Sequence, residues 1–556
     1  MEYQLYYIPM RKHAKILLNN QITFFWVLIV LIVSICKVFF QVDPIHDGTF
    51  YSSGFALNNG LKLYSEVATS YGPVTHLLSA AIIFLFGNAL VLHRITWLVI
   101  QLLIVLLTYK ILMIKFNKNT SISLAFFALL FDPTTIGFGF GFVNPGRYWP
   151  NQIIIIMSLI TLYSFSKIDL KNNNPTIFAY IIGISTSIFP FIRAQSTVMT
   201  FFVIPVSIIL FYKNKKNILY FFMGLITGFI ALTILLYKFM NFKDFFKQTI
   251  LIPLEPTVQY SKFDFFGSLK LFILIILTFI LVAGITIILR FFPRISTKSK
   301  IVFFVALFSL ISILTVNPLP LHASYKNPFF LILTLVKGSS FALIIILYMT
   351  LLYLALKNFY RFRSKIFLRY DPFYIFSLFI FIANIFAIYP KNGYFPYLLP
   401  LIAPFLFELM PIYRNYRNLF SCAVGMAVIS VCTITLTTFV YSSYSYSSNN
   451  LKYIKSTSSA NSTNADKEIE FLSNFSNRGI VWGTGCYELM SAITGNYLPK
   501  TANYGPDIPY SPKIESGELN LICGDEKTIL NNPSYKLVSD PLKISDSRSL
   551  MLIHME

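Results

Sequence analysis

The chain has 556 residues, of which 56% are hydrophobic and only 12% are charged, and its mean hydropathy is +0.65. Soluble domains carry about twice this charged fraction, so the composition excludes an ordinary soluble protein. The net charge of +22 does not indicate nucleic-acid binding, because the basic residues form short clusters between apolar runs. From Tyr441 onward there are 10 Lys and Arg against 12 Asp and Glu. This distribution predicts a polytopic membrane protein with basic cytoplasmic connections.

The first apolar run, at about 21–42, follows a basic N-terminal segment and is long enough to cross a bilayer. No small-residue cleavage site follows it, so we expect a retained signal anchor with a cytoplasmic N-terminus. A polar segment comes next, with the sequence Asp43-Pro44-Ile45-His46-Asp47-Gly48. We interpret residues 43–73 as an extracytoplasmic loop.

Fourteen apolar segments lie between residues 21 and 441. The basic connections alternate in a way that places residues 442–556 outside, which requires an odd number of crossings. The simplest solution has about thirteen transmembrane helices, with 74–90 as a helix that lies on or partly in the outer surface. Residues 1–441 would then form an all-α multi-span module whose first outer loop covers 43–90.

The tail begins with a linker at 442–464 that is rich in Ser, Tyr and Asn. Residues 465–556 predict a small extracytoplasmic α/β domain, with a helix at 467–475. Strands are expected at 479–482, 519–523, 535–538 and 550–553. Cys486 and Cys523 either form a disulfide in an oxidising compartment or remain buried thiols, and the sequence leaves both readings open.

Asp47 is the residue of the first outer loop with the most chemical interest. A carboxylate held at a membrane surface can accept a proton from a hydroxyl or ligate a divalent metal. Asp-Pro and Asp-Gly pairs are also common turn residues, and taken alone the segment fits a turn better. His46 either assists the acid or is a solvated loop histidine.

The residues that follow Asp47 resemble a known pattern when they are read together. They are Tyr51, Gly60, Tyr64, Tyr71-Gly72-Pro73, Phe86-Gly87 and Arg94. The stretch from about 43 to 94 resembles the GT-C glycosyltransferases that use lipid-linked sugars, in particular the protein O-mannosyltransferases and aminoarabinose transferases, although many members have two prolines where this chain has only Pro73. In the tail, Val481-Trp482-Gly483 followed by Tyr487 looks like a stretch of some bacterial members.

The resemblance implies a membrane glycosyltransferase in which Asp47 is the catalytic base. Asp43 is the weaker candidate because Pro44 follows it and it lies nearer the helix end. The expected substrate contacts are His46, Tyr51, Tyr64, Tyr71 and Tyr394. The implied donor is a polyprenyl-phosphate-linked hexose or pentose, and the acceptor is a glycan, a lipid or a protein. The site would lie on the extracytoplasmic face of the plasma membrane, with the bilayer and no nucleic acid as a further partner.

A lipid-phosphate leaving group needs positive charge on the outer face. Arg193 is the best candidate because it lies between two apolar runs on the predicted outer side, although a snorkelling arginine is the alternative. Arg147, beside Tyr148 and Trp149, is the second candidate. Lys391 is the third, and there Gly393 stands where the family often has a histidine.

The sequence leaves open the roles of the other acids and the need for a metal. Asp132 is either a second catalytic or metal-binding carboxylate or a turn acid. The outer loop at 241–268, with its acids, either lines an acceptor groove or is an ordinary polar loop. A divalent metal is allowed but not required, and no other cofactor is predicted, since no nucleotide-binding or zinc motif occurs.

Two other functions compete with the transferase. An O-antigen-type polymerase or ligase is also polytopic, but the long first outer loop and the outer tail argue against it. A transporter or lipid flippase predicts two matched halves with interrupted helices. The sequence shows no halved repeat, and its acids gather on one predicted face.

Overall fold

The computed structural model describes residues 44–126 and 150–168 with short gaps, 177–251 apart from residue 213, and 372–388. It also describes a few single residues, among them Val38 and Leu401, and most of the strands between 480 and 555. All statements below refer to these residues. The segments at 252–371 and 405–479, which contain several of the predicted spans, lie outside them.

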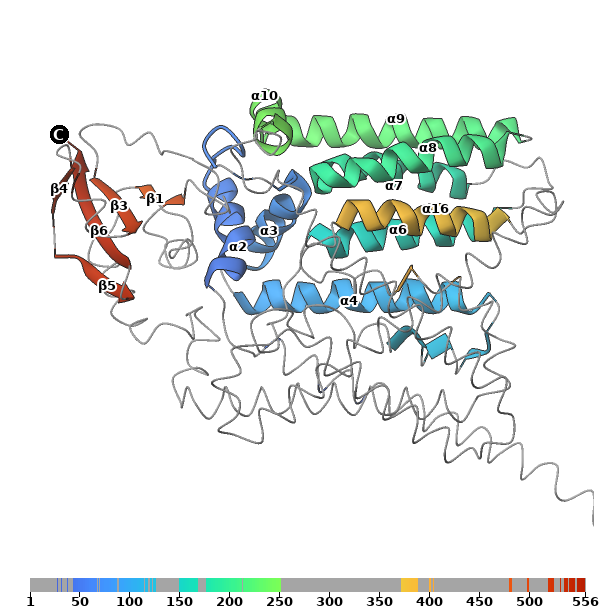
Figure 1. Ribbon diagram of the computed structural model, residues 1–556, viewed down its shortest axis with the longest axis horizontal. Coiled ribbons are helices and arrows are strands. Elements are labelled where there is room, and N and C mark those ends of the chain that lie inside the picture. Colours follow the sequence, from blue (N-terminus) through green and yellow to red (C-terminus); the bar gives the residue numbers. More distant parts are fainter. Residues whose placement is uncertain are drawn as a thin grey trace, which may run out of the picture.

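Six helices run side by side as a bundle (Figure 1). Three stretches in it are long and apolar enough to cross a membrane: Val91–Leu112, Ala194–Phe211 and Lys215–Tyr237. The chain is therefore a polytopic membrane protein, as predicted. The thirteen predicted crossings also involve residues outside the described part. The six helices are α4 (Leu90–Leu112), α6 (Pro150–Ser166), α7 (Ile177–Ile192), α8 (Thr197–Phe211), α9 (Lys215–Tyr237) and α16 (Pro372–Ile388).

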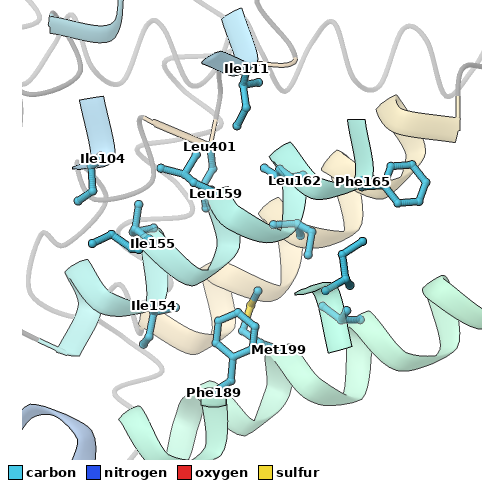
Figure 2. Close-up of a cluster of buried hydrophobic side chains, with 14 of the residues drawn as sticks. Ile104, Ile111, Ile154, Ile155, Leu159, Leu162, Phe165, Phe189, Met199 and Leu401 are labelled. Atoms are coloured by element: carbon cyan, nitrogen blue, oxygen red, sulfur yellow. The ribbon is translucent and has the colours of Figure 1, made fainter. Parts of the chain in front are cut away.

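The core of the bundle is centred on α6 (Figure 2). Leu159 and Leu162 of this helix are fully buried, as are Phe189 of α7 and Met199 of α8. At the far end of α6, the Phe165 ring stacks on Phe376 of α16 with centroids 4.2 Å apart. Apolar packing of this kind carries no strong directional preference, and specific contacts between particular helices add to it.

Helices α7 and α9 approach each other through glycines. A Cβ on Gly183 would lie 2.1 Å from the carbonyl oxygen of Phe221, and one on Gly224 would lie 2.1 Å from that of Tyr180. Gly228 follows Gly224 by one helical turn, and a Cβ there would meet Ser187. Small residues at this spacing allow two backbones to touch, as they do in many membrane helix pairs.

Two polar contacts fix other helices of the bundle. The Asn384 amide of α16 donates to the Ser158 hydroxyl of α6 at 3.0 Å. In α7, Pro190 has no N–H for the carbonyl of Thr186, four residues earlier. The Thr200 hydroxyl of α8 donates to this carbonyl at 2.9 Å. A backbone group that would otherwise be unpaired in an apolar environment is thereby satisfied.

Two further helices, α2 (Pro44–Asn58) and α3 (Pro73–Phe86), lie at one end of the bundle and run across its axis (Figure 1). We call this region the α2–α3 end. With 14 residues, α3 is about 21 Å long, too short for a hydrocarbon core of about 30 Å. This length fits the expectation that 74–90 does not cross the membrane.

Residues 44–58 of the segment 43–73, which we interpret as an outer loop, are helical and form α2. Pro44, Gly48 and Gly54 are turn signals in the sequence, but Pro44 begins the helix, where a missing N–H costs nothing. At Gly54, a Cβ would lie 2.4 Å from the Ser79 hydroxyl oxygen of α3. Gly54 therefore serves the close contact between the two helices and does not break α2.

The tail contains a mixed sheet in the order β2-β1-β3-β6-β4, with β5 paired to β6. The pairs β1–β2 and β1–β3 are parallel, and the pairs to β6 are antiparallel. Four strands lie where the sequence predicts them, and β2 and β5 were not predicted. The helix expected at 467–475 lies outside the described residues. The strands are β1 (Ile480–Trp482), β2 (Leu498–Pro499), β3 (Leu519–Gly524), β4 (Tyr535–Leu537), β5 (Leu542–Ser545) and β6 (Arg548–Met555).

The sheet lies at the α2–α3 end of the molecule, and β2 contacts α2 (Figure 1). Lys110, Lys167 and Lys215 occur where α4 and α6 end and α9 begins, at the opposite end of the bundle. The tail and the first predicted outer loop are therefore together, away from these basic residues.

Candidate functional site

The Tyr71-Gly72-Pro73 segment contacts the end of α7. A Cβ on Gly72 would lie 2.3 Å from the carbonyl oxygen of Phe191, so only glycine allows this approach. Gly72 is extended, as expected for the residue before a proline, and Pro73 starts α3. The motif therefore brings Tyr71 to the residue that follows α7, which is Arg193.

Arg193 lies between α7 and the short 3-10 helix η1 (Ala194–Ser196). Its guanidinium carbon is 5.8 Å from the centroid of the Tyr71 ring, and a guanidinium N–H donates to the Asn151 amide oxygen at 3.3 Å. The side chain is half-buried. Among the described residues no carboxylate pairs with this guanidinium. A half-buried cation that has no carboxylate partner in the described part of the chain can bind an incoming anion.

Asp47 lies near the start of α2, where the helix dipole favours a negative charge. The side chains of His46 and Asp47 lie outside the described part of the chain. Phe50 and Tyr51 follow Asp47 by about one helical turn, and both of their side chains are described and buried.

Phe50 connects α2 to the Tyr71 segment. Its ring centroid is 5.5 Å from that of Tyr71 and 5.2 Å from that of His76. Through Phe50 and Tyr71, the helix that carries Asp47 and the Arg193 guanidinium lie in one neighbourhood. The structure thus brings Tyr71, which belongs to the same sequence motif as Asp47, next to Arg193, which was selected on other grounds.

Tyr51 faces α4 and is fully buried, with its ring 5.0 Å from that of His93. Burial raises the pKa of the Tyr51 hydroxyl above its usual value, so the group stays protonated. Its oxygen has no hydrogen-bond partner among the residues that the structure describes. Next to His93 on α4, Arg94 is also buried and donates to the carbonyl of Val38 at 3.0 Å.

Tyr64 shapes the connection between α2 and α3. Its φ of 70° is unusual for a residue with a side chain, and its hydroxyl donates to the carbonyl of Tyr71 at 2.7 Å. Its ring packs edge-on against Phe245 of α10 (Phe242–Phe246). Tyr64 is buried, with 3% of its surface exposed, and its hydroxyl bond holds the Tyr71 segment in place.

Gln248 of η2 (Lys247–Leu251) holds the same connection from the other side. Its amide nitrogen donates to the carbonyl of Tyr64, and its amide oxygen accepts from the Thr69 N–H at 3.2 Å. Of the outer loop expected at 241–268, the described part therefore supports the α2–α3 connection.

His76, Ser53, Thr69 and Gln248 were not predicted from the sequence. The first three form a buried hydrogen-bonded set. The available signal was a histidine within the apolar run of α3, which fits an ordinary core position equally well. Several predicted residues lie outside the described part of the chain: Asp43, Asp132, Arg147, Lys391, Tyr394 and Cys486, together with the side chain of Cys523.

Lys391 follows the end of α16, a helix that contacts η1 beside Arg193. Within the described ranges, no group of three or more His, Cys, Asp and Glu residues is placed to hold a metal ion. The described residues therefore offer no set of ligands to which a metal could be assigned. The side chains of Asp43 and Asp47 lie outside these residues.

No protein-family model matches the chain, and no curated protein matches it. Among solved structures, it is similar to the Archaeoglobus fulgidus oligosaccharyltransferase in complex with Zn and sulfate, with a TM-score of 0.45 and 11% identity over 85% of this chain. The chain spans 62% of the length of that protein.

The chain is also similar to ArnT from Cupriavidus metallidurans, in the apo state with a TM-score of 0.43 and bound to undecaprenyl phosphate with a TM-score of 0.44. Both matches have 10% identity and cover 95% of this chain and 97% of ArnT. At these identities, a function has to be argued from the residues of the site.

Proposed function

We propose that this protein is a membrane glycosyltransferase that moves a sugar from a polyprenyl-phosphate donor to an acceptor at the extracytoplasmic face. The observation that carries the proposal is the position of Arg193. Its half-buried guanidinium has no carboxylate partner among the described residues, lies over Tyr71, and is joined through the Phe50 ring to the helix of Asp47. A cation and an acid at one end of a membrane bundle suit a reaction that releases a phosphate.

In the proposed reaction, the acceptor hydroxyl attacks the anomeric carbon while the bond from this carbon to the phosphate oxygen breaks. Asp47 takes the hydroxyl proton as general base. Arg193 stabilises the charge that develops on the lipid phosphate, so the leaving group needs no proton. Displacement in one step inverts the configuration at the anomeric carbon.

Asp43, Asp132, Arg147 and Lys391 remain candidates for supporting roles in this proposal. Tyr71 would contact the donor beside Arg193, and Tyr64 would act through Tyr71. Undecaprenyl phosphate, which one ArnT structure holds, is a suitable probe for the proposed lipid site. The C-terminal sheet contacts α2 through β2, which supports a role for the tail in binding the acceptor.

The test compares glycolipids and glycans of the cell envelope by mass analysis. A strain that lacks the gene is complemented with the wild type, with Asp47→Asn, or with Glu66→Gln as a matched control. Glu66 is an exposed acid of the same connection, and its carboxylate binds only a backbone N–H at 2.8 Å among its described contacts.

We expect the gene deletion to remove one sugar modification and Glu66→Gln to restore it. Asp47→Asn should lower transfer by about 100-fold or more, the usual contribution of a general base. A folded Asp47→Asn protein with full transfer activity would show that Asp47 is not the base. An unchanged set of envelope sugars in the deletion strain would contradict the transferase itself.

A further inference from the structure

His76 of α3 has no role in the proposed reaction, yet it is a fully buried polar residue at the centre of the α2–α3 end. Its Nδ1 is 2.6 Å from the Ser53 hydroxyl oxygen of α2, and its Nε2 is 3.1 Å from the Thr69 hydroxyl oxygen. Burial lowers the pKa of the imidazole to about 3. The ring is therefore neutral, with one nitrogen donating and the other accepting.

The bonds on either side extend this set to the backbone. The Ser53 hydroxyl oxygen lies 3.0 Å from the carbonyl oxygen of Phe50, and the Thr69 hydroxyl oxygen accepts from the Tyr71 N–H at 3.2 Å. In the tautomer with the proton on Nδ1, Ser53 accepts from His76 and donates to this carbonyl, while Nε2 accepts from the Thr69 hydroxyl. The chain of bonds therefore joins the backbone of Tyr71 to the backbone of Phe50.

The two ends of this chain are the residues that join the proposed acid to the proposed cation. Phe50 follows Asp47 by one helical turn, and Tyr71 lies under the Arg193 guanidinium. Their rings are also in contact, with centroids 5.5 Å apart. A ring contact alone allows sliding, whereas hydrogen bonds have defined lengths and directions.

We propose that His76 is a positioning residue for the transfer reaction: the Ser53–His76–Thr69 bonds fix Tyr71 relative to Phe50, and so fix Arg193 relative to the helix that carries Asp47. This inference rests on the proposed function. It predicts that His76 and Arg193 act on the same ligand as one unit, although they do not touch. A histidine that only fills the core would lower stability without changing what Arg193 contributes.

The first test is a double-mutant cycle in the full-length protein, with binding of undecaprenyl phosphate as the measurement. Arg193→Gln should weaken binding by about tenfold or more, because a charge-assisted bond to phosphate is lost. His76→Leu should also weaken it. In the His76→Leu background, the factor lost on Arg193→Gln should be smaller by about threefold or more.

The outcomes separate the two proposals. If Arg193→Gln binds undecaprenyl phosphate as well as the wild type does, the phosphate role of Arg193 in the proposed function fails. If Arg193→Gln weakens binding by the same factor in both backgrounds, the positioning role of His76 is overturned while the proposed function stands. His76→Gln keeps an oxygen that can accept from Thr69, and it should bind more tightly than His76→Leu.

A matched pair of serines tests the same idea if His76→Leu does not fold. Ser53 and Ser158 are both buried helical serines whose hydroxyl bonds a carbonyl of its own helix and one side chain of another helix, that of His76 or Asn384. Ser53→Ala should weaken binding of undecaprenyl phosphate by about threefold or more, whereas Ser158→Ala should leave it unchanged. Equal affinity in the two variants would overturn the positioning role.

Discussion

The α7–α9 pair of the bundle and the connection between α2 and α3 are held by different kinds of contact. Helices α7 and α9 meet because Gly183 and Gly224 have no side chain, so backbones touch. At the α2–α3 end, buried side-chain bonds from Tyr64 and His76 hold the connection in place. Added atoms should therefore damage the bundle most, and removed polar atoms should damage the α2–α3 end most. The following predictions test this contrast, from the largest expected effect to the smallest.

Gly183→Leu should have the largest effect on folding. Its side chain would start 2.1 Å from the carbonyl oxygen of Phe221, so α7 and α9 must separate, at a cost of about 3 kcal/mol or more. Thermal unfolding of the purified protein measures this. Ala231→Leu, at an exposed position of α9, is the control and should leave the melting temperature nearly unchanged. A normal melting temperature for Gly183→Leu would mean that the glycine contact does not set the helix spacing.

The α2–α3 end should lose stability in acid through His76. The pKa of His76 is about 3 in the folded protein and 6.5 ordinarily, so between these values the unfolded chain binds the extra proton. Stability is therefore fully present above about pH 6.5 and falls as the pH drops, by up to about 1.4 kcal/mol per pH unit. Thermal unfolding from about pH 7 to about pH 4.5 should show a shallower fall for His76→Gln than for the wild type. Parallel curves would contradict a buried neutral histidine.

Gly72→Ala is an exception that sharpens the contrast, because one glycine contact lies within the site. A Cβ there would lie 2.3 Å from the carbonyl oxygen of Phe191, so Tyr71 must move away from Arg193. We expect a loss of stability of about 1–3 kcal/mol together with weaker binding of undecaprenyl phosphate. Gly60→Ala is the control, since nothing lies within 4 Å of a Cβ there, although its φ of 89° adds backbone strain. Lower stability with unchanged lipid binding would show that the Gly72 contact does not position the residues that bind the lipid.

The smallest effect is expected for Thr200→Val, which removes the donor to the Thr186 carbonyl. The loss should be about 1 kcal/mol, as is usual for side-chain bonds between membrane helices. The carbonyl is open to Thr200 because Pro190 has no N–H. Pro190→Ala supplies that N–H, so Thr200→Val should cost less in the Pro190→Ala background. An equal cost in both backgrounds would show that the proline is not the reason for the bond.

The membrane class, the short helix before α4 and four strands of the tail could be predicted, because each depends on residues that are close together in the sequence. A membrane span is recognised from the length of an apolar run, and the strand at Leu519–Gly524 is a short apolar run between turn residues. Helix α2 was missed because Pro44 and Gly48 each follow an aspartate, in pairs that are common in turns. Pro44 fits the first turn of the helix, where its missing N–H costs nothing.

The site was predicted as a set of residue types and not as an arrangement. Asp47 and Tyr71 were selected from one motif and Arg193 from its position between two apolar runs, but that Tyr71 lies beneath Arg193 depends on a backbone contact between Gly72 and Phe191. His76 could not be distinguished from a core histidine, since its partners Ser53 and Thr69 are 23 and 7 residues away. Hydrogen-bond partners of this kind can be identified only when the fold is known.

The two bonds of Gln248 also have a consequence for biosynthesis. This side chain binds the carbonyl of Tyr64, 184 residues earlier in the chain, and the amide of Thr69, 179 residues earlier. At translation rates of about 5–20 residues per second, the ribosome needs roughly 10 to 40 s to travel that far. During this interval α2 and α3 have already emerged, but the connection between them lacks its last two bonds. The first part of the site to be synthesised is therefore completed only after α9 and α10 have been made.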